Sequence, residues 1–134
     1  MKAVKRNNSR GLPIGARVQA VDNSGAKEVR IIGVKGYKTV KRQLECACVG
    51  DLVTAHVTKG NPEMKHTVVK AVVVRQKQEY KRPDGMTIKF ESNGIVVVKD
   101  EKTGSPKGTI VKGAIAKEVA ERYPAVARIA NTVM

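Results

Sequence analysis

The chain has 134 residues, a length that forms about one domain with a core of its own, without help from metals or disulfides. Its 26 Lys and Arg residues against 12 Asp and Glu give a formal net charge of +14. Solubility needs a net charge of only about 2 to 8 in a small domain, so the excess indicates a polyanionic partner that exchanges counterions for basic side chains. The sequence contains no apolar run of about 18 residues, so we expect a soluble chain without a membrane partner.

The N-terminal residues 1–13 are basic and carry Lys5, Arg6 and Arg10 without an acid. Such a segment offers little apolar area to offset the entropy lost on ordering. We therefore expect an extended basic arm that orders on a partner. A solvated tail is the alternative.

From Ile14 onward the sequence has β patterns. Apolar and polar residues alternate over 14–20, the turn formers of 22–25 follow, and a β-branched run covers 29–34. Together they predict a hairpin. Residues 33–42 hold two glycines, four cations and no acid, so they predict an exposed basic loop.

Further strands are predicted at 43–49, 52–58 and 68–74. The last of these opens the stretch 71–98, in which two apolar runs stand on either side of a basic, turn-rich segment. Pro83-Asp84-Gly85 supplies the turn. We interpret this stretch as a cationic ribbon held on a rigid β frame.

Helical spacing first appears near the C-terminus, at Ile115, Val119 and Arg122, after a mixed-charge loop at 99–108. Pro124 is expected to end that helix. The segment 109–134 is therefore predicted to be helical. Because five or six short strands precede it, the fold class is mainly β, and a barrel is favoured since closure removes sheet edges. The chain 1–134 is treated as a single domain.

Catalytic and cofactor signatures are absent from the sequence. The only soft metal-ligand candidates are Cys46, Cys48, His56 and His66, and Cys-x-Cys with widely spaced histidines is weak support for zinc. We expect both cysteines to be small buried apolar groups in a reducing compartment, and the histidines to be surface or strand residues. No metal, no cofactor and no enzymatic activity are expected.

The three basic segments lie at connections between strands, and such connections can converge at one end of a barrel. The cations predicted to contact RNA are Lys5, Arg6, Arg10, Lys35, Lys38, Lys41, Arg42, Arg75, Lys77, Lys81 and Arg82. With only three Tyr and one Phe, base stacking cannot be the main contribution, so folded double-helical RNA fits better than single strands. Neutralising the four cations of the ribbon, from Arg75 to Arg82, is expected to weaken RNA binding and leave thermal stability nearly unchanged.

Two other functions remain open at this point. A free binder of single-stranded nucleic acid would depend on stacking by Tyr37 and Tyr80. A small hydrolase would need a convergent acid and base or a metal site.

Several ordered blocks resemble one known family. Residues 71–97 read Ala71-Val72-Val73-Val74, nine residues, Asp84-Gly85, four residues, Phe90, two residues, Asn93, two residues, then Val96-Val97. Further blocks lie at 20–26, 49–51, 82–85 and 113–118. Together they resemble the family of the universal large-subunit ribosomal protein fourteen. Gly11-Leu12-Pro13 and the long insertion 35–48 resemble its archaeal and eukaryotic branch.

This resemblance implies a five-stranded barrel with a β-ribbon and short C-terminal helices, acting as a structural constituent of the large subunit in cytoplasmic ribosomes. It implies binding to large-subunit ribosomal RNA and bridges to small-subunit ribosomal RNA. It also implies large-subunit proteins three and twenty-four-e as neighbours, and an anti-association factor that docks on the C-terminal face. On this chain that protein-facing surface would comprise Lys112, Lys117, Glu118, Glu121, Arg122 and Arg128.

Overall fold

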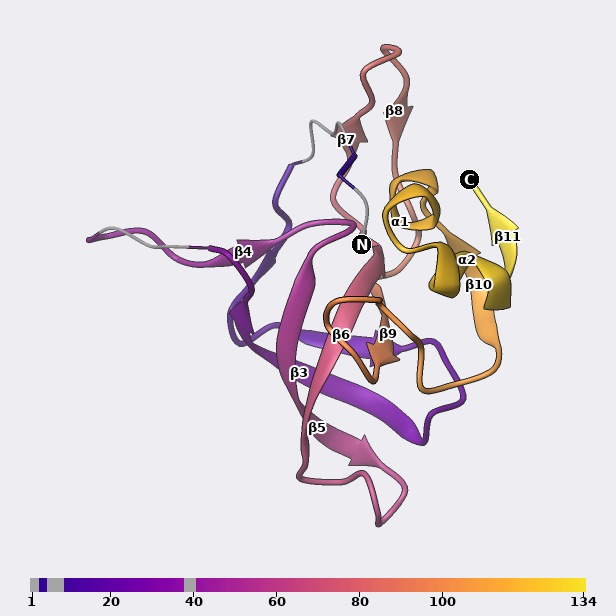
Figure 1. Cartoon of the computed structure of the whole chain (residues 1–134). Helices are drawn as coiled ribbons and strands as arrows, with labels where there is room; N and C mark the ends of the chain where they lie inside the picture. Colours follow the sequence, from indigo (N-terminus) through magenta and orange to yellow (C-terminus); the bar gives the residue numbers. More distant parts are fainter. Residues whose placement is uncertain (1–2, 5–8, 38–40) are drawn as a thin grey trace.

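The computed structural model describes residues 3–4, 9–37 and 41–134. Five strands in its centre form a closed barrel in the order β2-β3-β5-β6-β9 (Figure 1). They span Arg17–Ala20, Ala26–Val34, Leu52–Gly60, Val68–Arg75 and Gly94–Val98. The predicted fold class, mainly β with a small barrel, is confirmed.

The hairpin predicted near the N-terminus is the pair β2 and β3, with Val18 opposite Val29. Its turn contains Gly25 at φ +103°, a conformation that residues with a Cβ rarely adopt. The ring closes where β2 also pairs in parallel with β9, which places Ala20 opposite Ile95. The first barrel strand is therefore held between its hairpin partner and the last barrel strand.

Two apolar clusters lie on the two sides of the strands β6 and β9. Val73 and Ile95 point into the barrel cluster, whereas Val72 and Val96 belong to a second cluster that also contains Tyr123. Both strands are thus buried on two faces, which accounts for their continuous apolar runs in place of alternation. The C-terminal segment is what covers the outer face.

That C-terminal segment contains, within the described residues, two short helices and two strands. They are β10 (Val111–Ile115), α1 (Lys117–Arg122), α2 (Pro124–Ile129) and β11 (Ala130–Val133). The helical prediction for 109–134 was therefore wrong at both ends. There β10 and β11 pair in parallel although they are separated in the chain, and the spacing of apolar residues within each segment does not reveal such a pairing. Pro124 ends α1 as predicted, and it also starts α2, where a missing N–H has no cost.

Two more short antiparallel pairs lie outside the barrel. β1 (Leu12–Pro13) pairs with β4 (Cys46–Ala47), and β7 (Tyr80–Lys81) pairs with β8 (Thr87–Ile88). The second pair is the predicted ribbon. Leu12 is only 2% exposed, so the expectation of an arm that orders only on a partner is wrong for its last residues.

Asp22, at the end of the first hairpin strand, is a buried carboxylate. It accepts hydrogen bonds from the Ser24 hydroxyl at 2.9 Å and from the Val97 backbone N–H at 3.0 Å. Desolvation by burial is the largest influence on it and raises its pKa above the ordinary value of 3.8. The stability that this group contributes is therefore fully present below pH 3.8 and is lost as the pH rises through its folded-state pKa.

We expect the substitution Asp22→Asn to remove the contribution of this group to the pH dependence of the free energy of unfolding. Between about pH 4 and 7, the free energy of unfolding of the variant should rise relative to that of the parent chain, because Asn does not ionise. Urea unfolding of both proteins at several pH values measures the difference. A difference that falls with pH would show that the hydrogen bonds to Ser24 and Val97 outweigh the cost of burial.

Candidate nucleic-acid interface

The described part of the N-terminal arm packs against the base of the ribbon. The buried side chain of Gln76 donates a hydrogen bond from Nε2 to the Ser9 carbonyl at 2.9 Å. A Cβ on Gly11 would lie 2.5 Å from Cβ of Gln78, so only glycine allows this approach. The arm and the ribbon base are therefore held together from residue 9 onward.

The same arm also contacts the basic loop between β3 and β4. The Arg10 guanidinium carbon lies 4.7 Å from the ring centroid of Tyr37, a cation–π distance. On the other side of this loop, Lys35 lies 2.9 Å from Glu101, which is also 3.1 Å from Lys70. Hydrogen bonds from these two lysines lower the pKa of Glu101. The ionised Glu101 therefore connects Lys35 of the loop with Lys70 of the barrel strand β6.

The cations predicted to bind RNA divide into three groups. Lys5, Arg6 and Lys38 lie outside the described residues. Arg75 and Arg82 are not among the exposed residues, and the Arg82 side chain is only 12% exposed. The exposed cations, which we call the basic surface, are Arg10, Lys35, Lys41, Arg42, Lys77 and Lys81.

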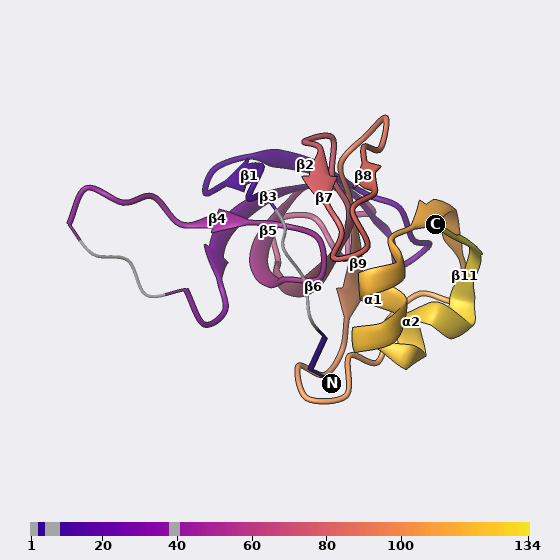
Figure 2. The same ribbon diagram turned by 90° about the horizontal axis from the view of Figure 1, so that it is seen from above.

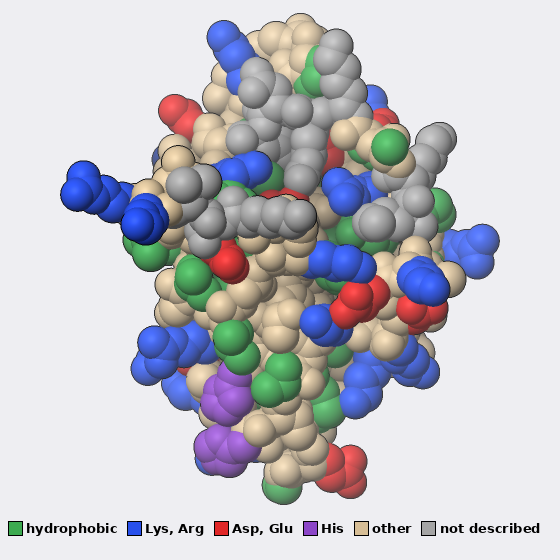
Figure 3. Space-filling model, turned by 60° about the vertical axis from the view of Figure 1, so that its left-hand side comes forward, with side chains coloured by type: hydrophobic (Ala, Val, Ile, Leu, Met, Phe, Trp, Pro, Cys, Tyr) green, Lys and Arg blue, Asp and Glu red, His purple; other side chains and the backbone are tan. Residues whose placement is uncertain are grey.

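The basic surface belongs to one end of the barrel, although its parts diverge. The ribbon β7–β8 rises from the barrel, while residues 35–37 and 41–45 lie to one side of it (Figures 1 and 2). Lys and Arg side chains project from both margins of the face shown in Figure 3. The arm thus contacts both other segments where they leave the barrel, whereas their tips reach in different directions.

Arg75 is occupied by internal contacts. Its Nε donates to the Ser92 hydroxyl at 3.1 Å, and one terminal nitrogen donates to the carbonyls of Lys112 at 2.9 Å and Ala114 at 3.2 Å. Burial lowers the pKa of this guanidinium. Because Arg75 connects β6 to β10, neutralising it is expected to reduce stability, contrary to the sequence-based expectation for the ribbon variant.

The Arg82 side chain is also engaged in internal contacts. Its Nε lies 2.8 Å from Oε1 of Glu118, with the two side chains only 12% and 8% exposed. The Tyr80 hydroxyl donates to the other oxygen of Glu118 at 3.0 Å, and burial, followed by the nearby Glu118 charge, raises the pKa of Tyr80 to about 12. Glu118 is therefore not a surface residue, and its predicted place on the protein-facing surface is corrected.

The other residues of the predicted protein-facing surface remain accessible. Lys112, Lys117, Glu121 and Arg128 are exposed, and Arg122 is half-buried. Lys117 and Glu121 lie 4.0 Å apart on one side of α1. The accessible surface of α1 and α2 thus carries mixed charge.

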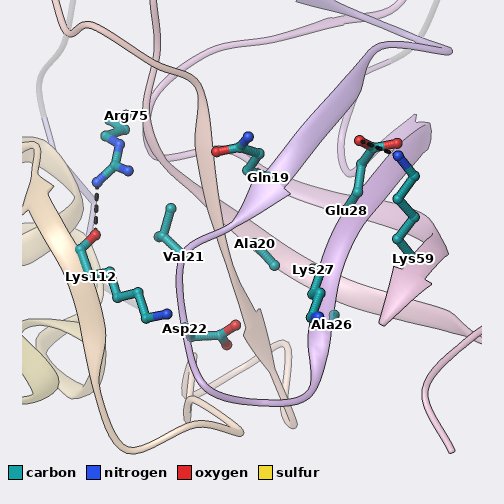
Figure 4. Close-up of a pocket in the computed structure, with 10 residues that line it drawn as sticks. All are labelled: Gln19, Ala20, Val21, Asp22, Ala26, Lys27, Glu28, Lys59, Arg75 and Lys112. Atoms are coloured by element: carbon teal, nitrogen blue, oxygen red, sulfur yellow. Dashed lines mark hydrogen bonds and ion pairs between the residues drawn. The ribbon is translucent and has the colours of Figure 1, made fainter. Parts of the chain in front are cut away.

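A second basic site was not predicted from the sequence. Lys27, Lys59 and Lys112 line an open hollow of about 390 Å³ beside the first hairpin (Figure 4). Arg75 and two acids, Asp22 and Glu28, complete the lining, and Glu28 lies 3.9 Å from Lys59. The three lysines come from different strands and are far apart in sequence. No local signal connects them, because only closure of the barrel and the docking of β10 bring them together.

The described residues hold no group of three or more His, Cys, Asp or Glu placed to bind a metal ion. The rings of His56 and His66 are neighbours, with centroids 5.9 Å apart and planes tilted by 31°. Cys48 is buried as expected, but Cys46 is only half-buried, so the prediction of two core cysteines was wrong for the first. In the same described part, neither helix is long and apolar enough to cross a membrane.

Comparison with known proteins agrees with this geometry. The family model for ribosomal protein L14p/L23e matches residues 11–134. The large ribosomal subunit protein uL14 of the archaeon Nanoarchaeum equitans (strain Kin4-M) is 51% identical over 134 residues, which cover all of both chains. Both similarities run through the barrel, the ribbon and the C-terminal segment. The chain therefore belongs to the ribosomal L14p/L23e family and is a structural constituent of the large ribosomal subunit.

Proposed function

We propose that the chain binds large-subunit ribosomal RNA through the basic surface. The observation that carries this proposal is the packing of residues 9–11 between the other two basic segments, through Gln76 on one side and Tyr37 on the other. Basic segments that would otherwise move independently are held in one relative position. Several weak phosphate contacts then add along one shaped RNA surface.

The kind of RNA follows from what the aromatic residues do. Tyr80 and Tyr123 are fully buried and Phe90 is 8% exposed, so none of them presents a face to a base. Tyr37 is half-buried and has Arg10 over its ring. This distribution disfavours a single-strand binder that stacks bases, and it supports phosphate and 2′-hydroxyl contacts to folded RNA.

The hollow at Lys27, Lys59 and Lys112 supports a second part of the proposal. It lies beside the turn that joins β2 to β3, away from the ribbon (Figures 1 and 4). We assign it to a second RNA segment. Two cationic surfaces on one rigid barrel suit a protein that contributes to bridges between large-subunit and small-subunit ribosomal RNA.

The C-terminal surface is proposed to face proteins. Its accessible charges are mixed in sign, as in the polar rim of a protein interface, and a phosphate site would be basic throughout. On this basis we retain an anti-association factor as the partner of this surface. Large-subunit proteins three and twenty-four-e are retained as neighbours of the chain, without a surface assigned to them. The residues retained for the C-terminal surface are Lys117, Glu121, Arg122 and Arg128. Lys112 is not retained, because it lines the hollow that we assign to RNA.

Competition binding across a salt series tests the RNA proposal. The probes are a large-subunit ribosomal RNA fragment, generic duplex RNA and single-stranded DNA of equal length. We expect a preference for the ribosomal fragment that persists at high salt, with a log–log slope of about −0.9 for each duplex phosphate neutralised. Equal binding to all three probes that disappears as salt rises would show only non-specific binding of a polycation, and it would contradict the proposal.

A further inference from the structure

Two sequence blocks that mark this family meet in an ion pair. Arg82 opens the block 82–85, and Glu118 closes the block 113–118. Their side chains join at 2.8 Å, and both are largely buried. Neither residue was expected to be internal, since one was predicted to contact RNA and the other a protein.

The ion pair connects three parts of the chain. Arg82 stands at the end of β7, Glu118 lies on α1, and a terminal nitrogen of Arg82 also donates to the Met134 carbonyl. Met134 is itself bonded to the backbone, since its N–H donates to Ile115 and its carbonyl accepts from Lys117 at 3.1 Å. The Arg82 side chain thus contacts both the first helix and the residue that follows β11, and it joins them to the ribbon.

The ribbon needs such an external contact. Its two strands share only two residue pairs, Tyr80 with Ile88 and Lys81 with Thr87, and an isolated two-stranded hairpin is marginally stable in water. The turn is well formed, with Gly85 at φ +92° donating its N–H to the Arg82 carbonyl at 2.9 Å. A good turn does not set the direction in which a ribbon leaves the barrel. That direction depends on contacts beyond the turn, which are the burial of Tyr80 in the second apolar cluster and the ion pair with α1.

We infer that Arg82 and Glu118 are positioning residues that hold the ribbon in one orientation, so that Lys77 and Lys81 meet RNA phosphates, and that Arg82 itself does not bind phosphate. A phosphate that drew Arg82 away would leave the Glu118 carboxylate buried and unpaired, which is strongly unfavourable. Lys81, the neighbour of Arg82, is exposed and free to make the contact. This inference rests on the proposed RNA-binding function.

The substitution Glu118→Gln separates positioning from simple charge. It removes a negative charge, so charge alone predicts tighter RNA binding, whereas loss of the ion pair predicts weaker binding. We expect about tenfold weaker binding to the ribosomal RNA fragment, as for other coupled pairs, with the salt slope unchanged. Arg82→Gln should give the same loss with the same unchanged slope, while the control Lys81→Gln should flatten the slope by about 0.9.

Either of two results would overturn the inference: binding by Glu118→Gln that equals or exceeds that of the parent chain, or a slope flattened by about 0.9 in Arg82→Gln. The double variant Arg82→Gln/Glu118→Gln leaves no buried charge unpaired, so it keeps the test available if a single variant does not fold. It should bind no more weakly than the single variants, because the two residues act as one unit.

Hydrogen exchange of the free protein tests the ion pair without RNA. We expect faster exchange at residues 80–88 in Glu118→Gln, and unchanged exchange in the barrel strands. If the parent chain showed no preference for the ribosomal fragment, the proposed function would fail, and this exchange result would still decide whether the ion pair orients the ribbon. Exchange at 80–88 equal to that of the parent chain would reject the positioning role.

Discussion

Removing four cations from the basic surface is expected to abolish most of the electrostatic affinity for RNA while leaving the fold intact. The substitutions are Lys41→Gln, Arg42→Gln, Lys77→Gln and Lys81→Gln. Each phosphate contact contributes about 0.9 to the log–log salt slope, so four lost contacts flatten it by about 3.6 and weaken binding about a thousandfold or more near 0.1 M salt. Because all four side chains are exposed, the melting temperature should stay within about 2 °C of that of the parent chain.

A matched variant controls for net charge. It carries glutamine at four exposed cations that are not part of the basic surface, namely Lys65, Lys107, Lys117 and Arg128. Both variants have a net charge of +10, which is +14 minus 4. If the two lost the same affinity in salt titrations, total charge alone would account for binding, and the basic surface would have no special role.

Truncating Tyr123 is expected to have the largest effect on stability. The ring is fully buried between α1 and α2, and a Cβ on Gly104 would lie 2.3 Å from its Cδ1, so the loop 99–108 closes directly over it. Tyr123→Ala should lower the free energy of unfolding by about 3 to 5 kcal/mol, as large aromatic truncations do. Urea unfolding followed by far-UV circular dichroism measures the loss.

Tyr123→Phe is the matched control for this truncation. It keeps the ring and removes only the hydroxyl, so we expect it to cost less than about 1.5 kcal/mol. A loss below about 1 kcal/mol in Tyr123→Ala would contradict the view that this ring anchors the C-terminal segment, because it would mean that the second cluster repacks without it.

Much of the barrel could be predicted because its strands are marked locally. The alternation in β2, the turn before Ala26 and the β-branched runs of β6 and β9 are properties of neighbouring residues. β10 and β11 carry no such mark, since Gly113 interrupts one strand and two helices separate the paired strands in the chain. Parallel pairing of short strands is decided by tertiary contacts, which a single sequence does not display.

The candidate site was harder to predict than the fold, since the sequence does not distinguish a cation that faces solvent from one that pairs with an internal acid. Lys81 and Arg82 are adjacent in the sequence, yet one is exposed and the other is paired with Glu118. Alternation along β7 predicts that they point to opposite sides, but not which side is occupied. The partner is on α1, beyond the last barrel strand, and no local pattern connects the two.

The closure of the ring has a consequence for biogenesis. Because β2 completes its pairing only with β9, the barrel cannot form until the nascent chain has been synthesised through Val98. Until then the nascent chain is a polycation whose sheet is still open, and non-local pairing of this kind is slow. We expect closure of the barrel to come late in folding, and the period before it to be the one in which the chain needs protection from stray nucleic acid and from aggregation.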